Sequence, residues 1–565
     1  MIKSIRLKFG SAPGMEHAEI QMTPVTVFVG PNNSGKSQVL SELQRFCVKG
    51  AKLENNLILD ELVFEQLSAE AAEERMAHAT LKPRPNEALP TGQVFVGRRG
   101  DRTKVPRAPL LDVLQDPNTQ VSRFCSWYLK YNTIILDGKN RINLTKEQPG
   151  GDLQQPPQTS FQVLFYDDKK RKEVRRIVNE AFDNYFVIDP TNLGRLRLKL
   201  SNREPSDDWE ERGIHAEAVR FHGAAQPIEQ TSDGVKAFTG IITEIIAGDP
   251  KVLLMDEPEA FLHPSLSHKL GKEIAQASAG TDKRIFVSTH SPNFVMGCIE
   301  SGIPVNIVRL TYRDEQATAR VLPNNEILRL MRNPLLRSTR VLEGLFYEFV
   351  VVTEADADRA FYQEINNRLL LLKPDWGIAN CLFINAQNKQ TVRTILKPLR
   401  ELGIPTVGIV DIDILKDGGG EWTGFLKSGF VPDISHQSQS EIRGALNKKL
   451  KATGSDMKRD GGLELLEEAD REAAGNLFDQ LEDYGLFVVR NGELESWLPV
   501  LQASGHGPTW LIEAFEKMGE DPDDSEYLRP GNDDVWEFMS RIKAWFSNPN
   551  KKGIPTSTQK DAEPD

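Results

Sequence analysis

The residues with the most recognisable chemistry are those that could bind a nucleotide phosphate. A run of eight residues at 30–37, GPNNSGKS, matches the pattern GxxxxGK[ST] and follows an apolar stretch at 25–29. The two glycines let consecutive backbone N–H groups surround a phosphate at a helix N-terminus. The alternative, an ordinary glycine-rich turn, does not require a buried strand before it and a helix after it. The sequence therefore predicts a phosphate-binding loop with contacts from Asn32, Asn33, Ser34, Gly35, Lys36 and Ser37.

The loop predicts partners elsewhere in the chain. Lys36 would neutralise the β- and γ-phosphate oxygens, and Ser37 would bind Mg²⁺. A second apolar stretch at 252–255 ends in Asp256 and Glu257, which is the Walker B pattern. Asp256 would hold Mg²⁺ through water, and Glu257 would orient the attacking water. ATP and Mg²⁺ are therefore the expected cofactors.

A separate set of carboxylates lies in the C-terminal half. Glu354 follows the apolar stretch 349–353, and Asp358 comes four residues later, on the first turn of a predicted helix. Asp411 and Asp413 end another apolar stretch and, two residues apart, would project to the same side of an extended chain. Because parallel strands end at one edge of a sheet, these groups should meet there.

A third apolar stretch, at 486–489, leads to Glu495, with Glu493 as an alternative. Carboxylates gathered without counter-ions repel one another, and hard divalent cations such as Mg²⁺ or Mn²⁺ relieve that repulsion. Asp356 points less clearly into this group. Lys389 is a candidate contact for a scissile phosphate, although a surface lysine is the common alternative. Solvated strand ends are the alternative for the whole set.

The elements that must position these groups follow an α/β pattern. Short apolar strands alternate with helices from 231 to 310, and again from about 345, with strands at 348–353, 381–385, 405–411 and 485–490. This alternation predicts parallel sheets covered by helices. We expect a first domain at 1–340 with an insertion or lobe at 48–220, a second at 345–545, and a disordered tail at 548–565.

Composition bounds the class of protein. A chain of 565 residues with 39% hydrophobic and 27% charged residues is an ordinary globular protein of two or three domains. No run approaches the roughly 18 apolar residues of a membrane helix, and the first ten residues lack a secretory signal. The four cysteines lie far apart, which excludes a disulfide framework or zinc finger and predicts a cytoplasmic protein.

The net charge of −12 argues against non-specific coating of nucleic acid, so a nucleic-acid path would need local basic patches. A solvated helix face and a basic loop are the alternatives for the two candidate patches. The first comprises Lys169, Lys170, Arg171, Lys172, Arg175 and Arg176, and the second comprises Arg98, Arg99, Arg102 and Lys104.

The first domain resembles the ABC/SMC-like ATPases. The run EPEAFLHP at 257–264 is similar to their DEPE-x-x-LHP motif, and His290, in STHSP, is similar to their γ-phosphate-sensing switch histidine. Residues 230–235, QTSDGV, resemble the start of their signature helix but depart from the usual LSGGQ. The resemblance implies that Ser232 and Gly234 contact nucleotide held by a second subunit, and hence a homodimer or homotetramer formed through the ATPase heads.

The second domain resembles a Toprim domain. The pattern E-A-x-x-D at 354–358, followed by DxD at 411–413 and a late glutamate, is similar to the Toprim metal motif. A P-loop ATPase followed by Toprim is the order found in OLD-family nucleases, including relatives in Gabija and retron defence systems. The resemblance implies metal binding by Glu354, Asp358, Asp411, Asp413 and Glu495, with Glu354 as ligand or general base.

Three functions remain open. The resemblance favours an ATP-regulated DNA endonuclease in anti-phage defence, with a second defence protein or a reverse-transcribed RNA–DNA as a candidate partner. An ATP-dependent sensor or scaffold with a non-cleaving Toprim domain is the second. A primase or topoisomerase is disfavoured, because no zinc module and no tyrosine in a cleavage-domain context is recognisable in the sequence.

Overall fold

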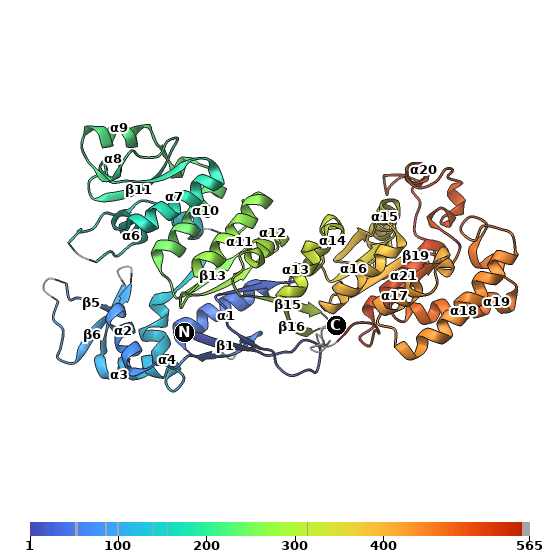
Figure 1. Ribbon diagram of the computed structural model, residues 1–565, viewed down its shortest axis with the longest axis horizontal. Coiled ribbons are helices and arrows are strands. Elements are labelled where there is room, and N and C mark those ends of the chain that lie inside the picture. The colour runs from blue at the N-terminus through green and yellow to red at the C-terminus, as the bar shows by residue number, and fades with distance from the viewer. Residues whose placement is uncertain are drawn as a thin grey trace. The chain divides into compact units, whose positions relative to one another are not determined.

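The computed structural model describes residues 1–50, 55–84, 87–98, 101–138, 140–154, 156–313 and 315–555. The chain forms two compact units, Met1–Asn324 and Asn325–Asp565, which we call unit 1 and unit 2 (Figure 1). The sequence predicted a first domain that ends at residue 340 and a second that begins at residue 345. Within the described residues, no helix combines the length and apolar character needed to cross a membrane.

Unit 1 is built around a six-stranded mixed sheet. Five strands are parallel, and the sixth pairs antiparallel with its neighbour at one edge. In spatial order they are β16 (Gln316–Leu322), β15 (Val305–Arg313), β3 (Val25–Val29), β14 (Arg284–Ser288), β13 (Val252–Asp256) and β8 (Thr133–Leu136). One strand, β14, therefore separates the strand before the phosphate loop from the strand that ends in Asp256.

Helices of unit 1 cover this sheet and extend into a lobe. Those that border the site are α1 (Lys36–Lys49), α5 (Asn140–Asn143), α10 (Asp233–Thr243), α11 (Pro264–Ser278) and α12 (Pro292–Glu300). The lobe comprises α6 (Ser160–Tyr166), α7 (Asp168–Phe182), β10 (Tyr185–Asp189), β11 (Arg195–Ser201), α8 (Asp208–Arg212) and α9 (Ala216–Ala224). Helices α11 and α12 lie side by side in Figure 1.

The segment 48–220 is more than an insertion. It contains the lobe and the hairpins of β5 (Thr80–Leu81), β6 (Gln93–Arg98) and β7 (Asp101–Pro106), but it also supplies β8 to the central sheet. It further supplies β4 (Leu59–Phe64), which pairs with β1 (Ile2–Leu7). The helix that follows this strand, α2, begins at Ala69 and ends at Ala79.

A buried carboxylate explains why β4 begins where it does. Glu42 of α1 is inaccessible to solvent, and its carboxylate accepts hydrogen bonds from the backbone N–H groups of Leu57 (2.7 Å), Ile58 (3.1 Å) and Leu59 (2.8 Å). These bonds satisfy the backbone N–H groups at the start of β4, and they tie β4 to the helix that follows the phosphate loop.

Unit 2 contains a four-stranded parallel sheet. Its order is β18 (Cys381–Asn385), β17 (Phe349–Thr353), β19 (Thr406–Asp411) and β20 (Leu486–Val489), which confirms the four predicted strands. The chain passes from β17 to β18 on one side and then returns to β19 on the other. The carboxyl ends of β17 and β19 thus form a topological switch point, where open parallel sheets bind ligands.

Helices cover this sheet, and the last of them continue unit 2 towards the C-terminus. They are α15 (Asp356–Leu372), α16 (Lys389–Glu401), α17 (Gly420–Ser428), α18 (Asp433–Ala452), α19 (Glu468–Glu482), α20 (Pro508–Met518) and α21 (Asp534–Ser547). The predicted disordered tail at 548–565 is wrong for residues 548–555. Lys552 pairs with Asp483 (2.7 Å), and buried Arg400 donates to the carbonyl of Gly553 (3.2 Å). Residues 556–565 lie outside the described residues.

The buried contacts of Glu42 give a first prediction. The change Glu42→Ala leaves three backbone N–H groups without acceptors, so it should lower the free energy of unfolding by about 3 kcal/mol. Scanning calorimetry should show a fall of several degrees in the unit 1 transition. Glu61→Ala, on the exposed surface of β4, is the matched control and should change the free energy of unfolding by less than roughly 0.5 kcal/mol. Equal shifts in both variants would contradict this role.

Candidate functional sites

The predicted phosphate loop forms between β3 and α1. Gly30 has a φ of 143°, and a Cβ there would lie 2.1 Å from the carbonyl oxygen of Leu310. Gly35 has a φ of 93°, and a Cβ there would lie 2.5 Å from Ile58. Only glycine fits at either position, so the spacing read from the sequence has a steric basis.

The remaining loop residues follow this curve. Asn33 adopts a left-handed φ of 61°, while Asn32 is exposed. Ser34 is buried, and its Oγ has no hydrogen-bond partner among the described protein groups. A buried hydroxyl without a protein partner, in a loop of this shape, is suited to a hydrogen bond with a phosphate of the ligand.

Lys36 bends back across the loop. Its ammonium donates to the carbonyl oxygens of Gly30 (2.9 Å) and Pro31 (2.7 Å), and its side chain is almost fully buried. Burial lowers the pKa of Lys36 to about 8, against the raising effect of Glu257 and Asp256. A buried ammonium with this pKa is suited to an anionic ligand, whose charge would favour the protonated form.

The two predicted Mg²⁺ ligands of unit 1 meet. Ser37 Oγ donates to Asp256 Oδ1 at 2.9 Å, and Ser288 Oγ donates to the same oxygen. Asp256 ends β13, Ser288 ends β14, and Ser37 opens α1. The carboxyl edge of the sheet therefore gathers the oxygen ligands that Mg²⁺ prefers, and these residues fit the ion.

The predicted water-orienting and sensing residues are also neighbours. His290 Nε2 lies 3.5 Å from Glu257 Oε1, and both side chains are partly exposed. Burial, followed by the nearby charge of Lys36, lowers the pKa of His290, so the imidazole is neutral at physiological pH. Glu259, to which the sequence assigned no role, accepts from Thr289 Oγ1 (2.7 Å) and from the backbone N–H of His290 (2.9 Å).

Arg141 is a further residue of this site that the sequence did not reveal. It lies on α5, just after β8, and its guanidinium donates to the carbonyl oxygens of Asp256 and Glu257. Glu257 has a left-handed φ of 49°, so these bonds hold a strained backbone in place. The signal that could have found Arg141 is its position after β8, a strand hidden in the region read as an insertion.

The two signature residues lie at the start of α10. Ser232 is exposed and caps the helix by accepting from the N–H of Val235 at 3.5 Å. Gly234 is buried against the loop after Glu257, where a Cβ would lie 2.6 Å from the carbonyl oxygen of Phe261. An exposed helix start with a closely packed glycine is compatible with contact to a second subunit.

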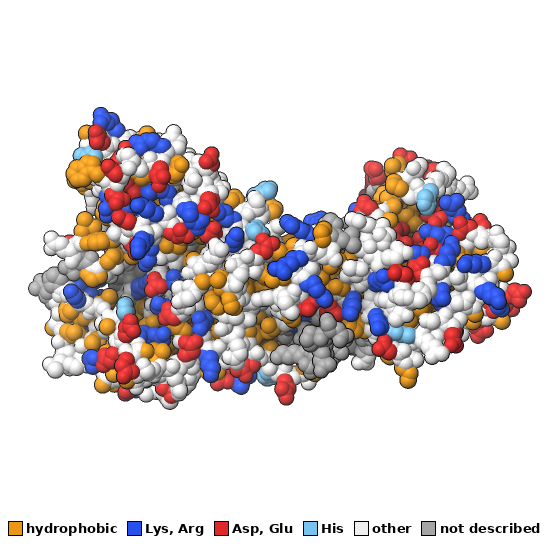
Figure 2. Space-filling view, viewed as in Figure 1, with side chains coloured by type: hydrophobic (Ala, Val, Ile, Leu, Met, Phe, Trp, Pro, Cys, Tyr) orange, Lys and Arg blue, Asp and Glu red, His pale blue; other side chains and the backbone are white. Residues whose placement is uncertain are grey.

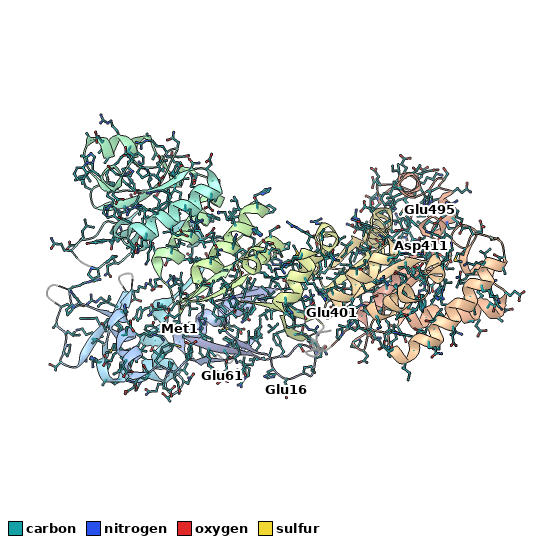
Figure 3. The ribbon with its side chains drawn as sticks, viewed as in Figure 1. Met1, Glu16, Glu61, Glu401, Asp411 and Glu495 are labelled. Carbon is teal, nitrogen blue, oxygen red and sulfur yellow. The ribbon has the colours of Figure 1, made fainter. Side chains whose placement is uncertain are left out.

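In unit 2, the ends of β17 and β19 bring the predicted carboxylates together. Glu354 Oε1 accepts from the backbone N–H of Asp411 at 2.9 Å. Asp358 Oδ2 accepts from the N–H of Ala355 at 2.8 Å, which fixes it at the start of α15. Figure 3 labels Asp411 and Glu495, both in unit 2.

The pKa values of these carboxylates report their crowding. Burial and then the charge of Asp411 raise the pKa of Glu354 to about 8. Burial and the charges of Asp411 and Glu495 raise the pKa of Asp358 to about 7. The pKa of Asp411 rises to about 6, again through burial first. Such shifts are typical of acids gathered in one cavity or around a cation.

Asp413 does not project as the sequence predicted. The chain turns into a 3₁₀ helix at Ile412–Lys416, so Asp413 no longer shares an extended backbone with Asp411. Asp413 Oδ2 instead pairs with Lys389 at 3.0 Å, and its Oδ1 is buried without a described hydrogen-bond partner. Lys389 also pairs with Asp417 (3.3 Å), so its charge is largely used in holding this turn.

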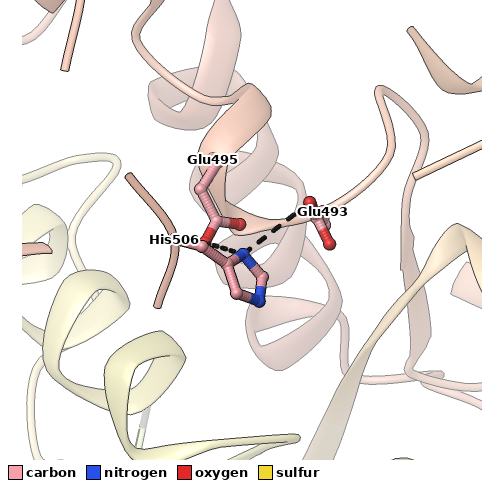
Figure 4. A group of neighbouring side chains, drawn as sticks. All are labelled: Glu493, Glu495 and His506. Atoms are coloured by element: carbon pink, nitrogen blue, oxygen red, sulfur yellow. Dashed lines mark ion pairs between the residues drawn. The ribbon is translucent and has the colours of Figure 1, made fainter. Parts of the chain in front are cut away.

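The late glutamates lie after β20. Glu493, Glu495 and His506 offer oxygen and nitrogen atoms that all lie within 4.8 Å of one another (Figure 4). Lys458 reaches between the groups, 2.7 Å from Asp411 and 3.2 Å from Glu493. The sequence kept Glu493 as an alternative to Glu495, and the structure places both beside the carboxylates. His506 and Lys458 were missed, because neither lies in a recognisable motif.

The donor set fits divalent cations. Lys458 pairs with Asp411 and Glu493, Lys389 pairs with Asp413, and one Asp413 oxygen remains without a described hydrogen-bond partner. Asp356, by contrast, pairs with Arg359 (2.8 Å) and accepts from Asn385 (2.9 Å), which lowers its pKa. Its own partners thus hold Asp356 apart from the carboxylates, as predicted.

Within the predicted basic patches, Lys169, Lys172, Arg176 and Lys104 are exposed, whereas other members are buried or paired. Arg171 and Arg175 are buried and pair with Glu211 (3.0 and 2.5 Å), and Arg176 pairs with Glu173 and Glu180. In Figure 2 the lobe shows basic and acidic side chains intermixed. In the second patch, Arg102 pairs with Glu87, Lys104 lies over Phe95, Arg98 donates to the carbonyl of Asp249, and Arg99 lies outside the described residues.

The crowding of Asp358 gives a second prediction. Its ordinary pKa of 3.8 is raised to about 7 in the fold, so the unfolded chain ionises first and stability is lost as pH rises from about 4 to 7. Asp358→Asn keeps the bond to Ala355 without the charge. Without added metal, the variant should melt several degrees above the wild type at pH 8 and at the same temperature near pH 4.

The control for Asp358→Asn is Asp356→Asn on the same helix, which should not raise the melting temperature. Millimolar Mg²⁺ or Mn²⁺ should raise the wild-type melting temperature and raise that of Asp358→Asn less, because bound ions stabilise the fold by mass action. If the melting temperature of Asp358→Asn at pH 8 is equal to or lower than that of the wild type, charge repulsion at Asp358 does not destabilise the fold and the prediction is wrong.

Comparisons with known proteins bear on unit 1. Residues 141–296 match the family described as "AAA domain, putative AbiEii toxin, Type IV TA system". That match includes Arg141, Asp256, Glu257 and His290, and it begins after the phosphate loop. No curated protein matches the chain.

Several solved structures are similar in part. An SMC head bound to the C-winged helix domain of ScpA is 16% identical, covering 58% of this chain and 99% of that chain, with a TM-score of 0.31. The SMC head domain from Thermotoga maritima is 15% identical (57% and 99% covered, TM-score 0.29). A nucleotide-free ATP-binding cassette from an ABC transporter is 13% identical (60% and 98% covered, TM-score 0.25).

At these low TM-scores the three structures do not bear on any individual residue. The family match and the geometry around Lys36 and Asp256 carry the assignment. Unit 1 is an α/β P-loop ATPase domain.

Proposed function

We propose that the chain is an ATP-dependent and divalent-metal-dependent DNA endonuclease of the OLD type, with a Toprim nuclease domain in unit 2. The observation that carries the proposal is the group of partly buried carboxylates at the switch point of the parallel sheet. Glu354, Asp358 and Asp411 come from two adjacent strand ends and have raised pKa values. A fold tolerates such repulsion where a cation is meant to bind.

The residues divide into two groups around the proposed metals. Glu354, Asp358 and Asp411 would hold one ion, and Glu495 would hold a second beside Glu493. Asp413 lies two residues after Asp411 and retains one oxygen without a described hydrogen-bond partner. Bound divalent ions would activate a nucleophilic water and stabilise the leaving oxygen in phosphodiester cleavage. Glu354, whose raised pKa favours proton transfer near neutral pH, is the proposed general base.

A second candidate is an ATP-dependent sensor or scaffold whose unit 2 binds nucleic acid without cutting. Lys458, paired with Asp411 and Glu493, is the observation that favours it, because this lysine already neutralises part of the carboxylate charge. Cleavage of plasmid DNA that requires Mg²⁺ or Mn²⁺ and stops in chelator would exclude the scaffold. The proposed defence role and the candidate protein or RNA–DNA partners rest on the OLD resemblance, and the proposed cytoplasmic location rests on the widely spaced cysteines.

Substitution of Asp411 tests the nuclease. Asp411→Ala should lower metal affinity and reduce cleavage by at least about 100-fold, because it removes a ligand from the centre of the group. ATP binding should be unchanged, since that site lies in unit 1. Asp356→Ala is the matched control, an acid near the same strand ends with partners of its own. Wild-type cleavage by Asp411→Ala would sink the proposal.

Substitutions in unit 1 test the ATPase and its assembly. Lys36→Ala should abolish hydrolysis and weaken binding, because it removes the buried charge at the loop. Glu257→Gln should retain ATP without turnover. If Ser232 and Gly234 complete a partner's site, sedimentation should show a dimer or tetramer with trapped ATP. Undiminished turnover in both variants, or a fully active monomer, would contradict these assignments.

A further inference from the structure

His506 stands beside the second proposed metal position. Its Nδ1 lies 2.6 Å from Glu495 Oε1 and 4.0 Å from Glu493 Oε1 (Figure 4). Ligands bound to one ion at about 2.0–2.2 Å stand roughly 3 to 4.3 Å from one another, depending on the angle between them. The 4.0 Å between His506 and Glu493 lies in this range, and a shift of a few tenths of an ångström would bring His506 and Glu495 into it as well.

The loop that carries His506 is fixed on both sides. Ser504 donates through its N–H (3.0 Å) and Oγ (2.6 Å) to Glu513 of α20. On the other side, the N–H of Gly507 donates to Glu495 Oε1 at 2.5 Å. Further back, the N–H of Leu498 donates to Asp534 at 3.0 Å. The imidazole is 65% exposed, so solvent and ions reach it, yet its backbone is held against the glutamates.

The chemistry of the donors distinguishes among cations. Mg²⁺ takes oxygen ligands in strict octahedral geometry and retains water, whereas an imidazole nitrogen suits transition metals. The carboxylates around Glu354 and Asp411 offer oxygen alone. The group of Glu493, Glu495 and His506 offers two oxygens and one nitrogen. These two neighbouring groups therefore differ in the ion that each should prefer.

We propose that His506 is a metal ligand of the second position, together with Glu493 and Glu495, and that it makes this position selective for Mn²⁺ over Mg²⁺. This inference rests on the proposed function, because it specifies the metal of that same site. The ion would replace the contacts of Lys458 and Arg459 with Glu493 (3.2 and 3.9 Å), while Lys458 keeps its 2.7 Å pair with Asp411.

Manganese spectroscopy of the full chain tests this directly. Mn²⁺ is added to nucleotide-free protein in excess Mg²⁺, and electron spin echo spectroscopy records any coupling between bound Mn²⁺ and a ¹⁴N nucleus. The wild type should show histidine nitrogen coupling. His506→Gln, which keeps a polar side chain of similar length, should lose it and bind Mn²⁺ at least about tenfold more weakly. Its affinity for Mg²⁺ should change less than twofold.

A matched control exists in unit 1. His268 pairs with Glu300 at 3.0 Å, and both side chains are partly exposed. Like His506 and Glu495, they form a histidine–glutamate pair, but this pair comprises a single glutamate. His268→Gln should retain the nitrogen coupling and the Mn²⁺ affinity of the wild type. Circular dichroism and the melting temperature of His506→Gln, compared with His268→Gln, show that the fold is intact.

Each outcome decides the inference. An absent nitrogen coupling in the wild type, or an unchanged one in His506→Gln, overturns it. If the wild type cuts DNA in Mg²⁺ but lacks the coupling, the inference fails while the proposed nuclease stands. If the coupling depends on His506 but no metal supports cleavage, the metal position stands and the proposed nuclease fails.

Discussion

Repulsion between buried carboxylates is the constraint around which unit 2 is arranged. The sheet order places Glu354 and Asp411 on adjacent strand ends, and the start of α15 adds Asp358. Water cannot screen these charges well there, so the structure answers with protonation, with hydrogen bonds from backbone N–H groups and with the ammonium of Lys458. None of these is needed for folding a four-stranded sheet. They are explained if the site is built for cations.

In unit 1, too, charged residues from different strands must be held in a fixed arrangement. The acids of β13 and the residues after β14 belong to separate strands, yet they must keep one geometry. Glu259 connects the two strand ends, because its carboxylate accepts hydrogen bonds from Thr289 and His290. Arg141, which follows β8, donates to the main-chain carbonyl of Glu257. The second Glu259 carboxylate oxygen and the Arg141 Nε remain without a described hydrogen-bond partner, so this network is only partly satisfied.

The sequence predicted the elements whose signals are local. The glycine spacing at 30–37, the apolar strands and the acids at their ends needed only neighbouring residues to be recognised, and the structure forms them. The predictions from the sequence failed where contacts between distant segments determine the structure. Strand β8 is four residues long and derives its place from pairing with β13, and β4 depends on a carboxylate in α1. The backbone at Asp413 differs from the prediction because a 3₁₀ helix, rather than an extended chain, follows Asp411. His506 needed a loop folded back through space.

The low pKa of Lys36 has a consequence for the energetics of nucleotide capture. With a pKa of about 8, a share of the empty loops holds a neutral amine in mildly alkaline solution. An incoming polyphosphate favours the ammonium, so its capture would draw a proton from the medium. The measured heat would then depend on the ionisation enthalpy of the buffer, and the apparent affinity would decline as pH rises beyond 8. In this way the burial that shapes the loop couples the energetics of nucleotide capture to the acidity of its surroundings.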